Sequence, residues 1–280
     1  MKLRSLLFVP GDRPHRMEKA LGAGADALIL DLEDAVASER KAEARRAVAE
    51  FLDRHATAPL WVRINPLDSS ESERDLAAIL PCHPDGVVLP KAEGGASVAE
   101  LARRLTERGN ATAKILAIAT ETPAAVFQLG SYGGAKRLAG LTWGAEDLPA
   151  AVGAATSREA DGRFTPPYEL ARSLCLFGAA AAGVAPIETV YPDFRDLEGL
   201  AGYTAKARRD GFTGMMAIHP AQVPVINAAF TPSDAEVAHA RAVVAAFAAN
   251  PGAGALSLDG RMIDRPHLIQ AQRILAAAAE

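Results

Sequence analysis

The sequence has 280 residues, of which 49% are hydrophobic and 23% are charged, and its formal net charge is −4. This composition is typical of a folded chain with a packed core, and it contains no basic stripe that would attract nucleic acid. The longest apolar stretches fall short of the roughly 20 residues of a membrane span. The first apolar run is cut short at Pro10, which is not the pattern of a signal peptide, so we expect a cytoplasmic protein.

Eight short apolar runs alternate with segments of helical length along the first 230 residues. Strands are expected over residues 4–10, 26–34, 59–65, 85–91, 113–120, 137–144, 185–191 and 214–220. Strands that alternate with helices are typically parallel, and their near-continuous apolar character fits burial on both faces. Eight such units favour a (β/α)8 TIM barrel over an open doubly wound sheet. In addition, the first predicted strand is not followed by the GxGxxG motif of dinucleotide-binding folds.

Residues 231–280 follow the eight units and predict a C-terminal extension. Residues 231–250 begin with Thr, Ser and Asp and have a helical period, residues 251–266 indicate a turn and a β-hairpin, and residues 267–279 a final helix. We therefore expect a barrel domain over 1–230 and an extension over 231–280. Such an extension would cap the barrel or pack on a neighbouring subunit.

Polar side chains gather where the predicted strands end, which is the edge at which barrel enzymes place their reacting groups. In chain order they are Arg13, Asp31, Glu33, Asp34, Arg63, Asn65, Lys91, Glu121, Glu146, Asp147, Glu188 and His219. Any single one of them could be an ordinary solvated loop charge. Their concentration at the strand ends predicts a polar mouth in which acids and bases are balanced.

Glu121 and Asp147 end adjacent predicted strands, so their carboxylates can converge on one point. Two carboxylate ligands, with water and substrate oxygens completing an octahedron, are typical of a Mg²⁺ site. The sequence has no His/Cys cluster at metal-binding spacing, which argues against zinc. The alternative is that both carboxylates pair with arginines of the rim.

Arg63 ends the third predicted strand and points toward the same mouth. Its guanidinium could bind a carboxylate with two hydrogen bonds or stabilise a developing oxyanion. The alternative is an internal ion pair with an acid of the rim. Arg13 and Lys19 flank the first turn between strand and helix, where they would either hold an anionic substrate or simply face solvent.

Nine segments of the chain resemble, in order, those of one known family. They are SLLFVPGDRPHRMEKA, DALILDLEDAV, VRIN, VVLPKAE, ETP, WGAEDL, YPDFRD, GFTGMMAIHP and GRMIDRP. Together they are similar to the citrate lyase β-subunit-like proteins of the HpcH/HpaI aldolase superfamily, which includes malyl-CoA and citramalyl-CoA lyases. The resemblance implies a (β/α)8 barrel, Mg²⁺ (or Mn²⁺) as cofactor, and reversible carbon–carbon cleavage of 3-hydroxyacyl thioesters.

The resemblance also implies roles for residues at the mouth of the barrel. Glu121 of ETP and Asp147 of GAEDL resemble the metal ligands, and Glu146 is then expected to support Asp147 through hydrogen bonds. Arg63 of VRIN resembles the substrate-binding arginine, and it would offset charge that grows on the substrate oxygen.

Further roles implied by the resemblance concern the thioester and the proton transfer. Arg13 and Lys19 resemble residues near the acyl-thioester, and Ile187 and Glu188 resemble residues that line the same pocket. Asp264 of GRMIDRP matches the catalytic acid/base that CoA lyases carry on their C-terminal segment. In such lyases this segment is thought to swing over the site of an adjacent subunit, so the resemblance implies a homotrimer or hexamer.

These roles predict a lyase that converts a 3-hydroxy-3-carboxyacyl-CoA thioester, such as malyl-CoA or citramalyl-CoA, into acetyl-CoA and a 2-keto acid, or forms it in reverse. The alternatives are a citrate lyase β-subunit that acts on an acyl-carrier partner, a malyl-CoA thioesterase, a CoA-independent pyruvate aldolase, and a catalytically silent ligand-binding paralogue. The aldolase would not need the C-terminal extension. The silent paralogue would not need Glu121, Asp147, Arg63 and Asp264 together.

Overall fold

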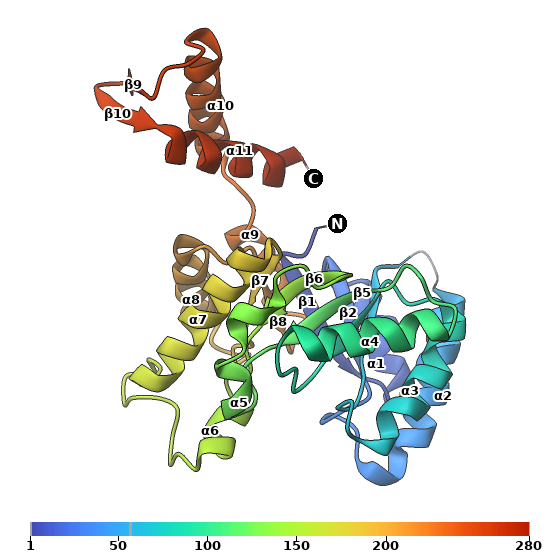
Figure 1. Cartoon of the computed structure of the whole chain (residues 1–280). Helices are drawn as coiled ribbons and strands as arrows, with labels where there is room; N and C mark the ends of the chain where they lie inside the picture. The colour runs from blue at the N-terminus through green and yellow to red at the C-terminus, as the bar shows by residue number, and fades with distance from the viewer. Residues whose placement is uncertain (1, 56–57, 280) are drawn as a thin grey trace. The chain divides into compact units, whose positions relative to one another are not determined.

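The computed structural model describes residues 2–55 and 58–279, and it divides into a barrel unit over residues 3–227 and a C-terminal unit that begins at Ala228 (Figure 1). In the barrel unit eight parallel strands form a closed sheet, in which β8 (Gly214–Ala217) pairs with β1 (Ser5–Pro10). The predicted (β/α)8 barrel is therefore confirmed. The strands between them are β2 (Ala27–Asp31), β3 (Leu60–Arg63), β4 (Gly86–Leu89), β5 (Lys114–Ile118), β6 (Leu138–Thr142) and β7 (Ala185–Glu188).

Helices follow the strands of the barrel unit and surround the sheet (Figure 1). Glycines Gly183 and Gly211 end two of the longest helices with a left-handed backbone, which glycine adopts at little cost. No helix in the described part of the chain is long and apolar enough to cross a membrane. The α-helices are α1 (Pro14–Leu21), α2 (Lys41–Arg54), α3 (Ser70–Ile79), α4 (Gly95–Glu107), α5 (Pro123–Val126), α6 (Asp147–Val152), α7 (Pro166–Ala182), α8 (Leu197–Asp210) and α9 (Gln222–Ala229).

Apolar side chains fill the interior of the barrel, so the sheet encloses a packed core and not a pore. Trp61 of β3 is fully buried there, and Gly86 of the neighbouring strand makes room for it. A Cβ atom at Gly86 would lie 2.2 Å from the indole ring, closer than real atoms approach. The same core cluster includes Leu6, Ile29, Val88, Leu116, Ile187 and Met216.

A buried polar network fixes the chain just after β3. Asp75 of α3 is fully buried, and its Oδ2 accepts hydrogen bonds from the backbone N–H (2.8 Å) and the side-chain amide (2.7 Å) of Asn65. Its Oδ1 accepts one from Arg45 at 3.0 Å. The Asn65 amide also donates to the Leu32 carbonyl at 2.9 Å. Asn65, which the sequence placed at the polar mouth, therefore holds the loop after β3 in place.

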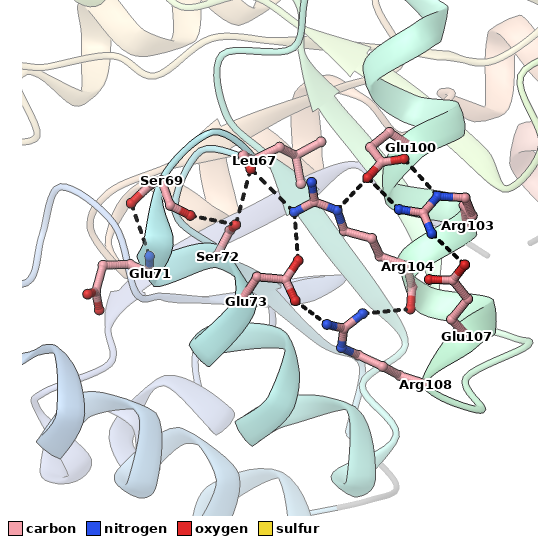
Figure 2. Close-up of polar contacts among 10 residues, drawn as sticks. All are labelled: Leu67, Ser69, Glu71, Ser72, Glu73, Glu100, Arg103, Arg104, Glu107 and Arg108. Atoms are coloured by element: carbon pink, nitrogen blue, oxygen red, sulfur yellow. Dashed lines mark hydrogen bonds and ion pairs between the residues drawn. The ribbon is translucent and has the colours of Figure 1, made fainter.

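An exposed ion-pair network joins α3 to α4 beside this loop (Figure 2). Arg104 of α4 pairs with Glu73 at 2.9 Å and with Glu100 at 2.7 Å, and it donates to the Leu67 carbonyl at 3.3 Å. Arg108 pairs with the other oxygen of Glu73. Each exposed pair contributes only about 0–1 kcal/mol, so the buried bonds of Asp75 matter more for stability.

The C-terminal unit has the helices and the hairpin that the sequence predicts. In it, α10 (Asp234–Ala249) and α11 (Arg265–Ala279) pack together with the antiparallel strands β9 (Ala255–Leu258) and β10 (Arg261–Asp264). Asp259 and Gly260 form a two-residue hairpin turn in which both residues have positive φ, as a type I′ turn requires. A small apolar core holds the unit together, formed by Ala240, Val243, Ile263 and Ala271.

We expect Asp75→Asn to destabilise the barrel, because the amide replaces an acceptor that holds two N–H groups and the ion pair with Arg45. Breaking a buried pair of this kind typically costs about 3 kcal/mol of unfolding free energy. Urea denaturation followed by circular dichroism would measure it. Glu73→Gln is the matched control and should cost less than about 1 kcal/mol. Equally small losses in both variants would contradict this view of Asp75.

Candidate active site

A cavity of about 270 Å³ lies where the strands of the barrel end. Its lining includes charged side chains from the ends of several strands, namely Asp31, Arg63, Glu121 and Asp147. Larger hollows of about 540 and 520 Å³ lie along residues 159–169 and between residues 158–169 and 191–206, respectively. Their charged side chains already pair with one another, Arg163 with Asp161 for example. We therefore place the candidate site in the cavity at the strand ends.

Arg63 is held between two carboxylates at the end of β2, Asp31 and Glu33. Its Nε and Nη2 donate to the two oxygens of Asp31 at 2.8 and 2.6 Å, and its Nη1 lies 2.9 Å from Glu33 Oε2. Its guanidinium also lies over the ring of Phe8, 4.8 Å from the centroid. Burial lowers the pKa of Arg63, but Asp31 and Glu33 more than offset this, so the net shift is upward. The internal ion pair that the sequence allowed is thus present, and the same side chain lines the cavity.

Lys91 follows β4 and connects three acids of the site. Its Nζ lies 2.9 Å from Glu33 Oε1 and 3.5 Å from Asp147 Oδ1. Its backbone N–H donates to Glu121 through a short contact. Lys91 has a positive φ of 50°, which is uncommon for a residue with a long side chain. The sequence placed Lys91 at the rim, but nothing in its motif indicated that both its backbone and its ammonium group contact acids.

Glu121 and Asp147, the two carboxylates expected to bind a metal ion, lie close enough to repel each other. Glu121 is only 3% exposed, and burial raises its pKa to about 8. The Lys91 backbone N–H lowers this pKa, whereas the charges of Asp147 and Glu33 raise it. Asp147 begins α6, and its side chain is 34% exposed. In the described part of the chain neither carboxylate pairs with an arginine, which was the alternative to metal binding.

Gly144 allows the segment after β6 to pack directly against Glu121. A Cβ atom at Gly144 would lie 2.4 Å from Glu121 Cγ, so only glycine leaves room for this carboxylate. The Gly144 N–H donates to Thr120 Oγ1 at 3.1 Å, which joins the end of β6 to the residue before Glu121. The segment WGAED therefore brings Asp147 to the cavity while it accommodates Glu121. Glu146 lines the same cavity from an exposed position.

The charges of the site fit a divalent cation. Six acids line the cavity or pair with its cations, and they are accompanied by two cations, Arg63 and Lys91; the acids are Asp31, Glu33, Asp34, Glu121, Glu146 and Asp147. Among residues 2–55 and 58–279, no group of three or more His, Cys, Asp or Glu side chains is arranged to hold a metal ion. Two carboxylates with water and substrate oxygens would satisfy Mg²⁺, which commonly keeps several non-protein ligands.

Glu188 and Ile187, which were expected to line the substrate pocket, are not among the residues that line the cavity. Glu188 is fully buried, and its Oε1 accepts a hydrogen bond from Trp143 Nε1 at 2.5 Å, while its Oε2 accepts one from Arg172 of α7 at 2.7 Å. Ile187 packs inside the barrel core. The cavity is lined instead by Trp143 and by Thr189, the residue that follows β7. Glu188 thus acts on the cavity through Trp143, whose ring it fixes.

Arg13, Lys19 and His219 are not part of the cavity lining. Arg13 immediately precedes α1, and its half-exposed side chain lies 3.5 Å from Asp12. Lys19 is exposed on α1. The His219 ring stacks on Phe194 with centroids 4.8 Å apart. Contacts of Arg13 and Lys19 with an acyl-thioester stay a prediction.

Asp264 belongs to the C-terminal unit, at the end of β10. Its Oδ1 lies 2.5 Å from Nδ1 of His267, a residue to which the sequence analysis gave no role. The sequence did contain a signal for this contact, because a His three residues after an Asp at the start of a helix lies next to it on the first turn.

The profile of the HpcH/HpaI aldolase/citrate lyase family matches residues 4–220. A citrate lyase subunit beta-like protein of Mycobacterium tuberculosis is 38% identical over 98% of this chain and 95% of its own length. A (3S)-malyl-CoA thioesterase of Cereibacter sphaeroides is 34% identical over 98% of this chain and 94% of its own. The crystal structure of CitE from M. tuberculosis in complex with magnesium, acetoacetate and coenzyme A has a TM-score of 0.82 at 37% identity, and the match covers 99% of this chain and 98% of that one. The chain therefore belongs to the HpcH/HpaI aldolase/citrate lyase family of carbon–carbon lyases.

Proposed function

We propose that the chain is a Mg²⁺-dependent lyase that cleaves, or forms, a 3-hydroxy-3-carboxyacyl-CoA thioester such as malyl-CoA or citramalyl-CoA, with acetyl-CoA and a 2-keto acid as the products. One observation carries this proposal. Glu121 and Asp147 converge beside Arg63 in one cavity, and the cations of the site pair mainly with the other acids. Relatives crystallised with magnesium and with acetoacetate and coenzyme A, or with oxaloacetate, support it.

Glu121 and Asp147 would hold the metal ion, and the same oxygen ligands would accept Mn²⁺. When bound there, Mg²⁺ would polarise the hydroxyl or keto oxygen of the substrate. The cavity of about 270 Å³ lies near the lower limit of ligand pockets, roughly 300 Å³. It would therefore contain the keto-acid part of the substrate, while the much larger CoA part extends outward.

Arg63 would bind the substrate without losing its protein partners. Asp31 and Glu33 contact its Nε, Nη1 and Nη2, and each terminal nitrogen carries a second N–H that can donate elsewhere. These two donors would contact the substrate carboxylate or the oxygen on which negative charge develops. Because both carboxylates fix the guanidinium plane in advance, little ordering remains to be done when the substrate binds.

Asp264 would transfer a proton to and from the methyl carbon of acetyl-CoA. In the direction of synthesis its carboxylate accepts a proton from the methyl group of acetyl-CoA, and the electron pair of that C–H bond attacks the keto carbon. In cleavage Asp264 returns the proton to the same carbon. We propose that the C-terminal unit brings Asp264 to the cavity of its own barrel or of a neighbouring subunit in a trimer-based assembly. The trimer and the cytoplasmic location stay predictions.

Thioester hydrolysis is a second candidate, because one relative is named a (3S)-malyl-CoA thioesterase. The two reactions differ in their products. A lyase releases acetyl-CoA and a keto acid, whereas a thioesterase releases free CoA and the intact hydroxy acid.

A panel of malyl-CoA, citramalyl-CoA and citryl-CoA, with products identified by chromatography, tests the proposal. We expect acetyl-CoA and a keto acid from at least one ester, and we expect EDTA to abolish the reaction and Mg²⁺ to restore it. Free CoA with an intact hydroxy acid would identify a thioesterase. Unchanged turnover in EDTA would contradict the metal-dependent lyase.

Arg63→Lys keeps the charge but removes the planar pair of donors, so we expect kcat to fall about 10²-fold or more, as for a lost oxyanion donor. The measurement is steady-state cleavage of the best ester in the panel. Arg103→Lys on the exposed face of α4 is the matched control and should leave kcat unchanged. If Arg63→Lys stayed within twofold of the wild type, Arg63 would serve only the fold.

A further inference from the structure

Asp264 and His267 form a close pair in the C-terminal unit. Asp264 ends β10, and His267 lies in the first turn of α11. The two side chains meet at 2.5 Å between Oδ1 and Nδ1, and both are partly open to solvent, 35% exposed for Asp264 and 47% for His267. The backbone N–H of Asp264 lies 3.2 Å from the same Nδ1, which either accepts from this N–H or, in the other tautomer, donates to Oδ1.

This contact differs from ordinary capping of a helix. An Asp that precedes a helix usually accepts a hydrogen bond from a backbone N–H two or three residues later. Asp196 does so before α8, where its carboxylate accepts from the Gly199 N–H at 2.8 Å. In the described part of the chain the Asp264 carboxylate accepts no such bond from α11 and faces the imidazole instead. Its orientation is therefore set by His267.

We assign the Nδ1-protonated tautomer to His267, because two lone pairs would repel each other at 2.5 Å, and Nδ1 then donates to Oδ1 and does not accept from the Asp264 N–H. Hydrogen bonds from a protonated nitrogen to an ionised carboxylate are usually 2.7–2.9 Å long, so this contact is at least as short as such a bond. A proton on Nδ1 fixes Oδ1 of Asp264. Because no other contact of this carboxylate is present in the described residues, Oδ2 is left free.

We propose that His267 is a positioning residue for Asp264, which holds Oδ1 so that Oδ2 faces the reacting carbon. This inference rests on the proposed function of the chain. In synthesis the C–H bond of the thioester α-carbon breaks, its electron pair becomes the enolate, and the proton forms an O–H bond at Oδ2. In cleavage the same proton returns from Oδ2 to the carbon. His267 donates one hydrogen bond throughout and is not consumed.

Three substitutions at His267 separate this role from a merely structural one. His267→Asn keeps an N–H donor near the place of Nδ1, His267→Gln moves the donor toward the place of Nε2, and His267→Leu removes it. His239→Leu, an exposed histidine on α10 of the same unit, is the matched control. The readout is exchange of the acetyl-CoA methyl protons with deuterium from solvent, together with kcat and KM of cleavage.

We expect His267→Leu and His267→Gln to lower the exchange rate and kcat about 10- to 100-fold with little change in KM, as when the partner of a functional group is lost. In His267→Asn the exchange rate and kcat should stay within about threefold of the wild type, and in His239→Leu both should equal the wild-type values. Exchange and kcat within twofold of wild type in His267→Leu would overturn the proposal. So would equal losses in the Leu, Gln and Asn variants.

Two further measurements keep this inference distinct from the proposed function. Asp264→Asn should abolish proton exchange; if exchange persists there, the proposed role of Asp264 fails and the inference fails with it. Loss of exchange in Asp264→Asn with normal exchange in His267→Leu would overturn the inference alone. The ¹⁵N spectrum of His267 provides a readout without substrate. Its Nδ1 signal should shift in Asp264→Asn, and an unchanged signal would show that the pair does not form.

Discussion

Negative charge that the protein itself does not neutralise is the constraint on which the site depends. Asp31 and Glu33 pair with Arg63 and Lys91, while among the described residues Glu121 accepts a hydrogen bond from the Lys91 backbone N–H and forms no ion pair of its own. A buried carboxylate without a compensating charge is costly, and it either takes up a proton or attracts a cation. Burial accordingly raises the pKa of Glu121 to about 8. A divalent cation between Glu121 and Asp147 would remove this cost.

The barrel supplies the geometry that makes this concentration of charge possible. Parallel strands end at the same edge, so residues at the ends of β2, β3, β5 and β6 meet although they are far apart in the sequence. Close packing then fixes them individually. Gly144 leaves room for Glu121, and the buried bonds between Asp75 and Asn65 hold the loop that follows Arg63. The same contacts that stabilise the fold thus define the positions of the acids.

Much of this arrangement could be predicted from the sequence, because eight apolar runs mark the strands and the polar residues after them must share one edge. The convergence of Glu121 and Asp147 follows from that logic. Side-chain direction did not follow from it. Adjacent residues of a strand face opposite sides, so Ile187 packs into the barrel core while Glu188 bonds Arg172 and Trp143, and neither side chain lines the cavity. The contacts of Lys91 and His267 depend on local backbone geometry that no motif indicated.

Calorimetric titration with Mg²⁺ tests the central claim most directly, because it requires no assumption about the substrate. Glu146 and Asp147 are adjacent acids, both on the cavity, so Glu146→Ala and Asp147→Ala remove the same charge from neighbouring positions. If Glu121 and Asp147 hold the ion, Asp147→Ala should lose saturable Mg²⁺ binding while Glu146→Ala stays within about threefold of the wild-type affinity, since loss of a direct ligand costs more than loss of a neighbouring charge. Unchanged binding in Asp147→Ala, or equal weakening in both variants, would contradict a metal site at these two strand ends.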